Sequence, residues 1–390
     1  MTLAKADPAE AALSARPAAR WTADEVRRVA STAARPGHAP PLLPDAARRP
    51  LFDGVTIWDM WPLAEPDGRS AAVCGGRLWF ALSAPAELEP DARHDVARIL
   101  LVLETADGGW RDCGPALPDG LAPGSREWSG SAVLSAPGRV RLFFTAAGRR
   151  GEAAATFEQR LFELDGRLVE TDAGPRLRDW TAPRESVAPD GRVFLHTPAA
   201  PVRPGVIKAW RDPAVFRDPV GGEAYLLFAA SLVQAEGGFD GALGIARAQG
   251  DGRGWRLLAP LLSAAGVNRE LERPHMLVRD GLYYLFWCTQ RQMFAPGLQA
   301  PTGLYGMVGD GPLGPFRPLN GSGLVLANPP EAPRQEYAWW VTGEGEVTAF
   351  VDHLGPEPFA DRPQGDAARF GGAPGPFRRL SFDGDRVGLA

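Results

Sequence analysis

The sequence has few of the residues that build disulfide frameworks and metal centres. Its 390 residues include three cysteines, Cys74, Cys113 and Cys288, which lie far apart and form no C-x-x-C pair. The five histidines are equally scattered and form no H-E-x-x-H pattern. An odd number of cysteines cannot close into a complete disulfide set, and isolated ligand residues do not make a zinc site. We therefore predict no bound metal and no cofactor.

Long apolar runs and basic runs are also missing. No stretch approaches the roughly 20 apolar residues that span a bilayer. The net charge is −5, and no basic run is long enough to follow a phosphate backbone, so neither a membrane nor nucleic acid is expected as a partner. At the N-terminus, Asp7, Glu10 and Arg16 interrupt the apolar core that a signal peptide needs. We expect a cytoplasmic protein, or one exported by an unconventional route.

The composition is that of a globular β-protein. Hydrophobic residues make up 45% of the chain, and 46 glycines and 38 prolines leave little room for long helices. Residues 1–50 are rich in Ala, Pro and Arg, and Thr22 followed by Glu25 predicts one capped short helix. We therefore expect an N-terminal arm over residues 1–50 that packs on an all-β domain over residues 51–390.

A loose repeat gives this all-β domain a more specific form. Five segments rich in aromatic or β-branched residues recur at intervals of 59 to 84 residues. These strand candidates are 77–83, 140–148, 224–231, 282–289 and 346–352. Each interval has room for about four short strands, which is one blade of a β-propeller. Four or five blades would form a closed ring, whereas a pair of β-sandwiches with accidental spacing is the alternative.

Acidic residues in three dense local contexts are the candidates for chemistry. Asp59 lies between the tryptophans of "WDMWPL", Asp212 lies in "WRDP", and Glu270 and Glu272 lie in "RELERPHM". A period of two would place Glu270 and Glu272 on one face of a strand, where two like charges repel unless a pocket or nearby arginines hold them. Taken singly, these patterns are typical of a turn, a strand-end ion pair and a solvated strand face.

Together, three carboxylates from separate blades could meet at the central funnel of a propeller, which suits the cleavage of a glycosidic bond. One carboxylate attacks the anomeric carbon, and a second protonates the leaving oxygen. A third can hold sugar hydroxyls and stabilise the developing positive charge. Aromatic side chains provide apolar walls for the sugar ring.

Five ordered sequence blocks carry a specific resemblance. They are "WDMWPL" at 58–63, "EWSGSA" at 127–132, "WRDPAVF" at 210–216, "ERPHM" at 272–276 and "GLYGMVGDGPLGPFRPLNGSGLVLANP" at 303–329. The chain resembles glycoside hydrolase family 68, the levansucrases and related bacterial β-fructofuranosidases, from about Trp21 to its last blade.

The resemblance implies a five-bladed β-propeller with a central acidic active-site pocket. It also implies a retaining double displacement on sucrose, with acceptor sugars or water receiving the fructosyl unit. On this interpretation Asp59 is the nucleophile, Asp212 stabilises the transition state and Glu272 is the acid/base.

The same resemblance implies eight substrate-binding residues. Those that match residues lining the fructosyl and glucosyl subsites are Trp58, Trp128 and Arg211. Ser129 matches the serine that orients the nucleophile. Those that fall at or beside positions contacting the glucosyl unit or the acceptor are Glu270, Gln290, Arg291 and Tyr337.

Departures from the family pattern concern the acceptor side and a metal site. Gln290 replaces a His or Arg, Trp339 and Trp340 add bulk to a "YSHY"-like segment, and Ala214 replaces a frequent His. We therefore predict hydrolysis or short transfer products rather than strong polymer synthesis. Arg269 stands where calcium-binding members carry an aspartate, so no calcium requirement is expected. Family members are usually extracellular.

Three other functions are considered from the sequence. A related five-bladed glycosidase acting on another furanoside or on a fructan would share the fold and the carboxylates. A non-catalytic sugar-binding propeller would keep the pocket without turnover, and a scaffold propeller would need an exposed partner motif that the sequence does not show.

Overall fold

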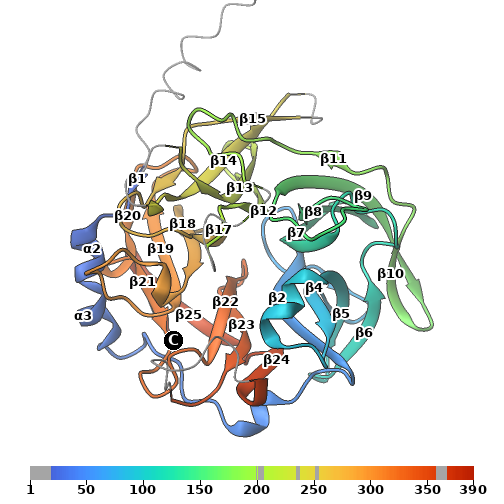
Figure 1. Cartoon of the computed structure of the whole chain (residues 1–390), viewed down its shortest axis with the longest axis horizontal. Coiled ribbons are helices and arrows are strands. Elements are labelled where there is room, and N and C mark those ends of the chain that lie inside the picture. The colour runs from blue at the N-terminus through green and yellow to red at the C-terminus, as the bar shows by residue number, and fades with distance from the viewer. Residues whose placement is uncertain (1–18, 199, 201–205, 234–237, 251–253, 357–366) are drawn as a thin grey trace, which may run out of the picture.

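The computed structural model of the chain describes residues 19–198, 200, 206–233, 238–250, 254–356 and 367–390. Antiparallel strands form five blades arranged around a central axis, which confirms the prediction of a five-bladed β-propeller (Figure 1). We number the blades 1 to 5 in chain order. The innermost strand of each blade comes first in that blade's sequence and lies next to the axis.

Blades 1 to 3 come from the first two thirds of the chain. Blade 1 contains β2 (Val55–Ala64), β4 (Gly76–Pro85), β5 (Arg98–Thr105) and β6 (Trp110–Pro115). Blade 2 contains β7 (Arg126–Ala136), β8 (Arg139–Ala147), β9 (Gln159–Thr171) and β10 (Gly174–Arg178). Blade 3 contains β12 (Trp210–Arg217), β13 (Ala224–Ser231), β14 (Gly241–Ala248), β15 (Trp255–Leu257) and β16 (Leu262–Ser263).

Blades 4 and 5 complete the ring. Blade 4 contains β17 (Glu272–Arg279), β18 (Leu282–Thr289), β19 (Gly303–Gly309), β20 (Phe316–Pro318) and β21 (Leu324–Ala327). Blade 5 contains β22 (Glu336–Val341), β23 (Glu346–His353), β24 (Phe370–Pro374), β25 (Arg378–Asp383) and β26 (Arg386–Leu389). The short strands β3 (Ala72–Val73) and β11 (Arg184–Glu185) pair with β4 and β9. Short 3₁₀ helices lie in the connecting segments: η1 (Asp45–Arg48), η2 (Pro90–Asp95), η4 (Arg291–Met293), η5 (Leu319–Gly321) and η6 (Ala367–Arg369).

The five strands predicted from the repeat are the second strands of the five blades. They correspond to β4, β8, β13, β18 and β23. Each second strand is almost continuously buried, because neighbouring blades cover both of its faces. The sequence of a strand that is buried on both faces is a nearly unbroken run of apolar residues. This is why the repeat could be read from the second strands and not from the innermost ones, which also carry polar residues.

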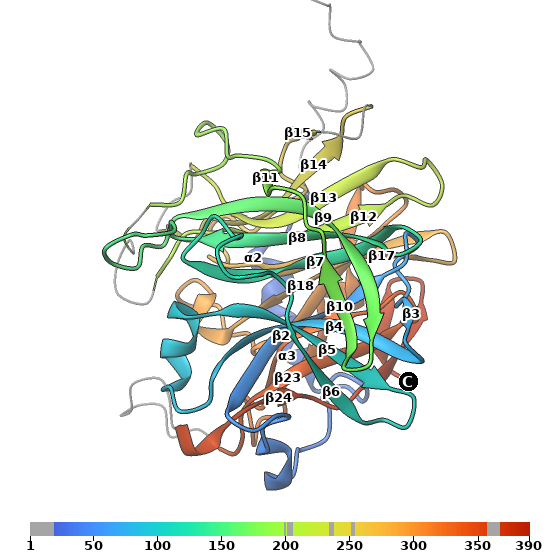
Figure 2. The same cartoon turned by 90° about the vertical axis from the view of Figure 1, so that its right-hand side faces the viewer.

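The seams between neighbouring blades use both backbone and side chains. At the ends of β2 and β7, Leu63 and Ala64 pair in parallel with Ala132 and Val133, which joins blades 1 and 2 into one sheet. On the outside of the same seam β10 packs against β5 and β6 (Figure 2). These contacts leave the innermost strands side by side around the axis.

The ring closes between blade 5 and blade 1 through side chains. Arg77 of β4 bonds to Glu104 of its own blade at 2.8 Å and also pairs with Glu346 of β23. Phe377 packs against Trp79 of blade 1 with ring centroids 5.3 Å apart. First and last blade are therefore joined by an arginine bridge and an aromatic contact.

The N-terminal arm lies on the outside of blades 3 and 4. Strand β1 (Ala19–Arg20) pairs in parallel with β16, and helices α2 (Ala23–Arg27) and α3 (Val29–Ala33) lie outside blade 4 (Figure 1). Trp21 is buried and its indole N–H donates to the Ser322 carbonyl at 2.9 Å. The predicted capping box is confirmed, since Thr22 and Glu25 exchange both hydrogen bonds. Residues 1–18 of the predicted arm lie outside the described residues.

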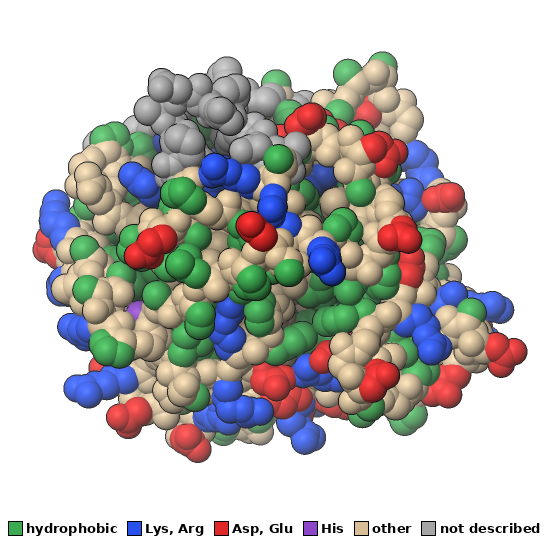
Figure 3. Space-filling model, turned by 90° about the horizontal axis from the view of Figure 1, so that it is seen from below, with side chains coloured by type: hydrophobic (Ala, Val, Ile, Leu, Met, Phe, Trp, Pro, Cys, Tyr) green, Lys and Arg blue, Asp and Glu red, His purple; other side chains and the backbone are tan. Residues whose placement is uncertain are grey.

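Charges are mixed over the surface. In Figure 3, acidic and basic side chains are interspersed on the face that is shown, in keeping with the net charge of −5. Among the described residues, no helix is both long enough and apolar enough to cross a bilayer.

Candidate active site

A cavity of about 370 Å³ lies where the innermost strands meet. All three carboxylates predicted to be catalytic line it, although the sequence separates them by more than 50 residues at each step. The polar and charged lining residues are Asp59, Asp91, Arg93, His94, Asp95, Ser129, Arg211, Asp212, Glu270, Glu272, Arg273, Gln290 and Tyr337. The apolar ones are Trp58, Leu82, Trp128, Phe157, Ile207, Met293, Ala338 and Phe350.

Each innermost strand is interrupted by a β-bulge, and the bulges direct the cavity residues. The register shifts lie between Trp58/Met60, Trp128/Gly130, Arg211/Ala214, Glu272/His275 and Tyr337/Trp340. Four of the five bulges contain a non-glycine residue with positive φ: Asp59 (39°), Asp212 (61°), Arg273 (52°) and Ala338 (56°). Such conformations cost about 1–3 kcal/mol each and cluster at functional sites. A bulge re-aims a side chain, so the same distortion repeated in the blades turns these residues toward one centre.

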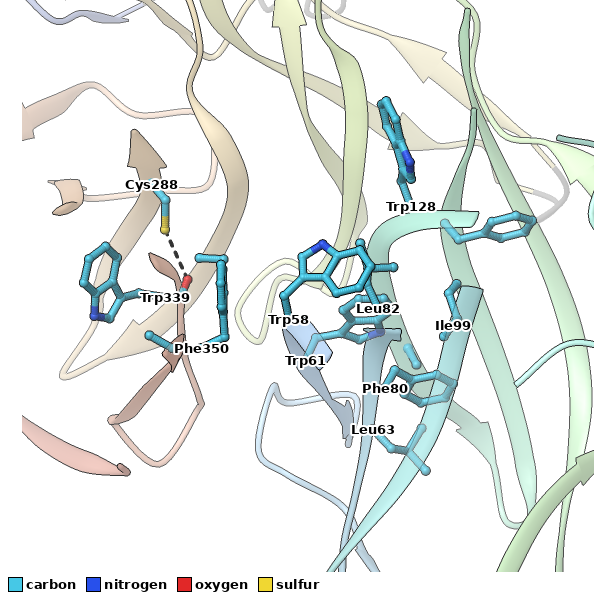
Figure 4. Packing of buried hydrophobic residues seen from close by; sticks show 14 of the residues in the cluster. Trp58, Trp61, Leu63, Phe80, Leu82, Ile99, Trp128, Cys288, Trp339 and Phe350 are labelled. Atoms are coloured by element: carbon cyan, nitrogen blue, oxygen red, sulfur yellow. Dashed lines mark hydrogen bonds between the residues drawn. The ribbon is translucent and has the colours of Figure 1, made fainter. Parts of the chain in front are cut away.

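Asp59 is held by the second blade. The Ser129 hydroxyl of β7 donates a hydrogen bond to Asp59 Oδ2. Trp58, the preceding residue, is 1% exposed and packs in the main core beside Leu82 and Trp61 (Figure 4). Burial raises the pKa of Asp59, while the positive charge of Arg273 and the bond from Ser129 act to lower it. The site therefore keeps this carboxylate poorly hydrated and fixed in orientation.

Asp212 is anchored through its backbone and its carboxylate. Its amide N–H donates to Thr145 Oγ1 at 2.9 Å, and the same hydroxyl donates to the Ser129 carbonyl at 3.0 Å. Asp212 Oδ2 accepts a hydrogen bond of 3.0 Å from the Arg273 amide. Burial raises the pKa of Asp212 to about 7, opposed by the charge of Arg211. Blades 2, 3 and 4 are thus linked directly at this residue.

One arginine holds both glutamates of the "ELE" segment. Arg211 Nη2 lies 2.9 Å from Glu270 Oε2 and 2.9 Å from Glu272 Oε1. The two glutamates therefore lie on one side, as the period of two predicts, but only Glu272 belongs to β17 and Glu270 precedes it. Burial raises the pKa of Glu270 to about 7, while Arg211 acts to lower it. The Tyr337 hydroxyl donates to Glu272 Oε2, so both oxygens of Glu272 have a donor.

Of the residues expected on the acceptor side, some line the cavity and others do not. Gln290 lines the cavity, but Arg291 is exposed in η4 and is not among the lining residues. Neither Trp339 nor Trp340 lines the cavity. Trp339 is fully buried, with its carbonyl accepting a hydrogen bond from the Cys288 thiol at 3.3 Å (Figure 4), and Trp340 stacks on His275. The expectation that these tryptophans add bulk to the acceptor side is wrong, because β22 turns them into the protein and presents Ala338 instead.

Helix η2 contributes a side of the cavity that sequence reasoning missed. Arg93 lies over the Trp58 ring, 5.2 Å from its centroid, and the His94 ring meets Trp58 edge-on at 5.6 Å. The His94 carbonyl accepts a hydrogen bond of 3.1 Å from the Trp128 indole. Burial lowers the pKa of His94 well below its ordinary range, so the imidazole is neutral. The only sequence signal was the density of charge in "DARHD", which is typical of any exposed loop.

Arg273 was also missed, although it belongs to the "ERPHM" block. Its guanidinium donates to the carbonyls of Met60 and Ala338, in the innermost strands of blades 1 and 5. No local pattern distinguishes such an arginine from one that caps a strand end.

No metal centre is evident in the described part of the chain, where no group of three or more His, Cys, Asp or Glu side chains could hold an ion. Arg269, which the sequence analysis took as a reason to expect no calcium requirement, lies over the Phe239 ring at 4.6 Å.

Comparison with known sequences finds matches to levansucrases and to the family profile that includes them. The sequence profile described as levansucrase/invertase matches residues 11–240 and 237–387. A levansucrase of Pseudomonas syringae pv. actinidiae is 32% identical over 379 residues, covering 86% of this chain and 83% of the relative. A levansucrase of Zymomonas mobilis is 33% identical over 366 residues, covering 86% of this chain and 82% of the relative.

Solved structures agree with the sequence comparison. An inulosucrase from Halalkalicoccus jeotgali bound to kestose superimposes with a TM-score of 0.86 and 39% identity, covering 96% of this chain and 95% of that one. The catalytic domain of a β-fructofuranosidase from Microbacterium saccharophilum gives a TM-score of 0.82 and 26% identity, covering 97% and 91%.

Proposed function

Because this chain belongs to the levansucrase/invertase family, we propose that it transfers the fructosyl unit of sucrose to water or to an acceptor sugar. The observation that carries the proposal is the meeting of Asp59, Asp212 and Glu272, from three different blades, in one cavity. Relatives named levansucrase and inulosucrase match nearly the whole length of the chain.

In the first half of the proposed reaction, Asp59 attacks the anomeric carbon of the fructosyl unit. The bond from that carbon to the glycosidic oxygen breaks, and Glu272 transfers its proton to this oxygen as glucose leaves. A covalent fructosyl-enzyme ester remains on Asp59. The bond from Ser129 orients the attacking carboxylate, and the apolar wall of Trp58 excludes water around it.

In the second half, Glu272 takes a proton from water or from an acceptor hydroxyl. The oxygen so activated attacks the anomeric carbon, the ester bond breaks, and Asp59 regains its carboxylate with overall retention. Arg211 and Tyr337 keep Glu272 in one orientation through both halves. Asp212 faces the sugar ring and stabilises the positive charge that develops on it.

Two unsatisfied polar groups support a hydroxyl-rich ligand in this cavity. Trp58 Nε1 and Arg211 Nη1 are buried and have no hydrogen-bond partner among the residues that the structure describes. A buried donor without a partner costs about 1–3 kcal/mol, which a sugar hydroxyl would offset. Both side chains line the cavity beside the carboxylates.

The acceptor side supports hydrolysis or short products. Gln290 is uncharged, whereas the family pattern used in the sequence analysis predicts His or Arg there, and Met293 and Ile207 are among the apolar residues of the same cavity lining. Incubation with sucrose followed by size analysis of the products tests this, and abundant high-mass fructan would contradict it. Linkage analysis of any transfer product in the same assay separates levan-type from inulin-type synthesis.

The experiment that tests the function is the Asp59→Asn variant assayed with sucrose. Asparagine has the same shape but cannot form the ester, so turnover should fall by several powers of ten while the fold is retained. Asp53→Asn, an exposed aspartate in the turn before β2, is the matched control and should keep wild-type activity. Wild-type protein that binds sucrose without releasing glucose would refute the enzymatic proposal in favour of a sugar-binding propeller.

A further inference from the structure

Arg273 occupies the point where four blades meet beneath the cavity. Its side chain is 2% exposed, and its guanidinium reaches the carbonyls of Met60 in blade 1 and Ala338 in blade 5. Its amide N–H donates to the carboxylate of Asp212 in blade 3. A single residue of blade 4 therefore bonds to each of the three other innermost strands β2, β12 and β22.

Each of these bonds lies next to a residue of the proposed mechanism. Met60 follows Asp59, Ala338 follows Tyr337, and Arg273 itself follows Glu272. Because Asp59, Arg273 and Ala338 all have positive φ, the bulges that direct these side chains are the segments that Arg273 connects. A bulge has lost local ladder hydrogen bonds, so its orientation depends on such outside contacts.

The conformation of Arg273 is fixed by its own surroundings. Its guanidinium lies over the Trp340 ring at 5.3 Å, and its carbonyl accepts a 3.0 Å hydrogen bond from His275 Nδ1. His275 Nε2 accepts the Val341 amide at 3.0 Å, which assigns the ring proton to Nδ1. The positive charge beside Asp59 is therefore held at a constant place.

We propose, resting on the function proposed above, that Arg273 is a positioning residue that sets both the orientation and the charge state of the nucleophile Asp59. Its two bonds to backbone carbonyls hold the bulges of β2 and β22 in register with β17. Its guanidinium, bonded to the carbonyl of the residue after Asp59, supplies a fixed positive charge beside this buried carboxylate.

Some of the other groups that face Asp59 raise its pKa and others lower it. Glu272 of β17 raises the pKa of Asp59, whereas Arg93 of η2 lowers it, and the bond from Ser129 of β7 also lowers it. Asp212 of β12 is a further negative neighbour that interacts with Asp59. The charge of Arg273 acts to lower this pKa, so its removal should raise the pKa of Asp59.

Two substitutions separate the charge of Arg273 from its bonds. Arg273→Met removes both, and we expect kcat to fall at least about a hundredfold and the acid limb of kcat/KM to move upward by about 1–3 pH units. Arg273→Lys keeps the charge but has one nitrogen in place of the two that reach the carbonyls of Ala338 and Met60, so kcat should fall while the acid limb stays near its wild-type position.

Arg77→Met is the matched control. Arg77 also bridges two blades, through Glu104 and Glu346, but it does not line the cavity. Its loss should lower the melting temperature and leave both kcat and the acid limb unchanged. An acid limb that does not move in Arg273→Met, or that moves equally in Arg77→Met, overturns the proposal. If Arg273→Met does not fold, wild-type kcat in Arg273→Lys overturns it.

An NMR titration of Asp59 does not depend on sucrose turnover, so it tests the role of Arg273 separately from the proposed function. In protein labelled with ¹³C at aspartate carboxyls, the Asp59 resonance is the one missing from Asp59→Asn. Its titration midpoint should be higher in Arg273→Met than in wild type or Arg273→Lys. An unchanged midpoint refutes the role of Arg273 even in an active enzyme, whereas a raised midpoint supports it even if sucrose proves not to be the substrate.

Discussion

Replacing Asp212 by asparagine should make the protein more stable while removing its activity. Burial raises the pKa of this carboxyl from its ordinary value of 3.8 to about 7. One pKa unit corresponds to about 1.4 kcal/mol, so keeping Asp212 ionised in the folded protein costs about 4 kcal/mol above pH 7. Asparagine has no charge to desolvate, and its amide oxygen can still accept the bond from the Arg273 amide.

The sign of the pH dependence follows from proton linkage. Between pH 4 and 7 the folded protein binds a proton at Asp212 that the unfolded chain has released, so wild-type stability falls as pH rises through this window. The variant lacks this effect. Its advantage should therefore be near zero below pH 4, grow by up to about 1.4 kcal/mol per pH unit, and level off above pH 7.

Urea unfolding of both proteins at pH 4, 5.5 and 8, followed by circular dichroism, measures this difference. Asp53→Asn, an exposed position, serves as the control and should show no pH-dependent gain. The activity of Asp212→Asn on sucrose should fall by at least about a hundredfold, because a stabiliser of transition-state charge is lost. A variant that is no more stable than wild type at pH 8 would refute the electrostatic reasoning.

Three other predictions concern the nucleophile, the acceptor side and metal dependence. Ser129→Ala removes a hydrogen bond to a carboxylate, so the pKa of Asp59 should rise and the acid limb of kcat/KM should move to higher pH; an unmoved limb contradicts this. Gln290→Arg places a positive charge in the cavity lining and should raise the ratio of transfer to hydrolysis, measured as free fructose against free glucose. Prolonged treatment with EDTA should change neither sucrose turnover nor the melting temperature, and a loss of either would show a metal requirement.

The sequence was informative where burial makes the pattern local. The second strand of each blade is apolar on both faces, so five ranges could be read as strands from residue types alone. The capping box at Thr22 is equally local, since its two hydrogen bonds join residues three apart. Functional-site prediction was different, because no local pattern distinguishes Asp59 or Asp212 from a turn residue, and only the ordered blocks and their resemblance to a known family selected them.

Residues whose role depends on partners far along the chain could not be read in this way. Arg93 reaches the site from the loop between β4 and β5, where it lies over Trp58 of its own blade and over Phe350 of blade 5. Arg273 reaches it from the start of β17, and its guanidinium bonds to backbone carbonyls of blades 1 and 5. The two tryptophans of "EYAWWV" are the reverse case, because they were expected at the cavity and do not line it. Their composition indicated a bulky acceptor side, but the bulge at Ala338 shifts the alternation of β22 and turns both rings into the protein.

Residue types and their order along the chain establish which side chains are available: five apolar strands long enough for five blades, and carboxylates at 59, 212, 270 and 272 among aromatic and basic neighbours. Which of these side chains meet depends on the folded ring. Closure of the ring brings the innermost strands together, and a bulge at the same level of each strand turns Asp59, Asp212 and Glu272 into one cavity. The physical reason is that alternation along a strand fixes only which residues share a face, whereas convergence on one sugar-sized space depends on the relative placement of strands that the chain reaches only after 60 residues or more.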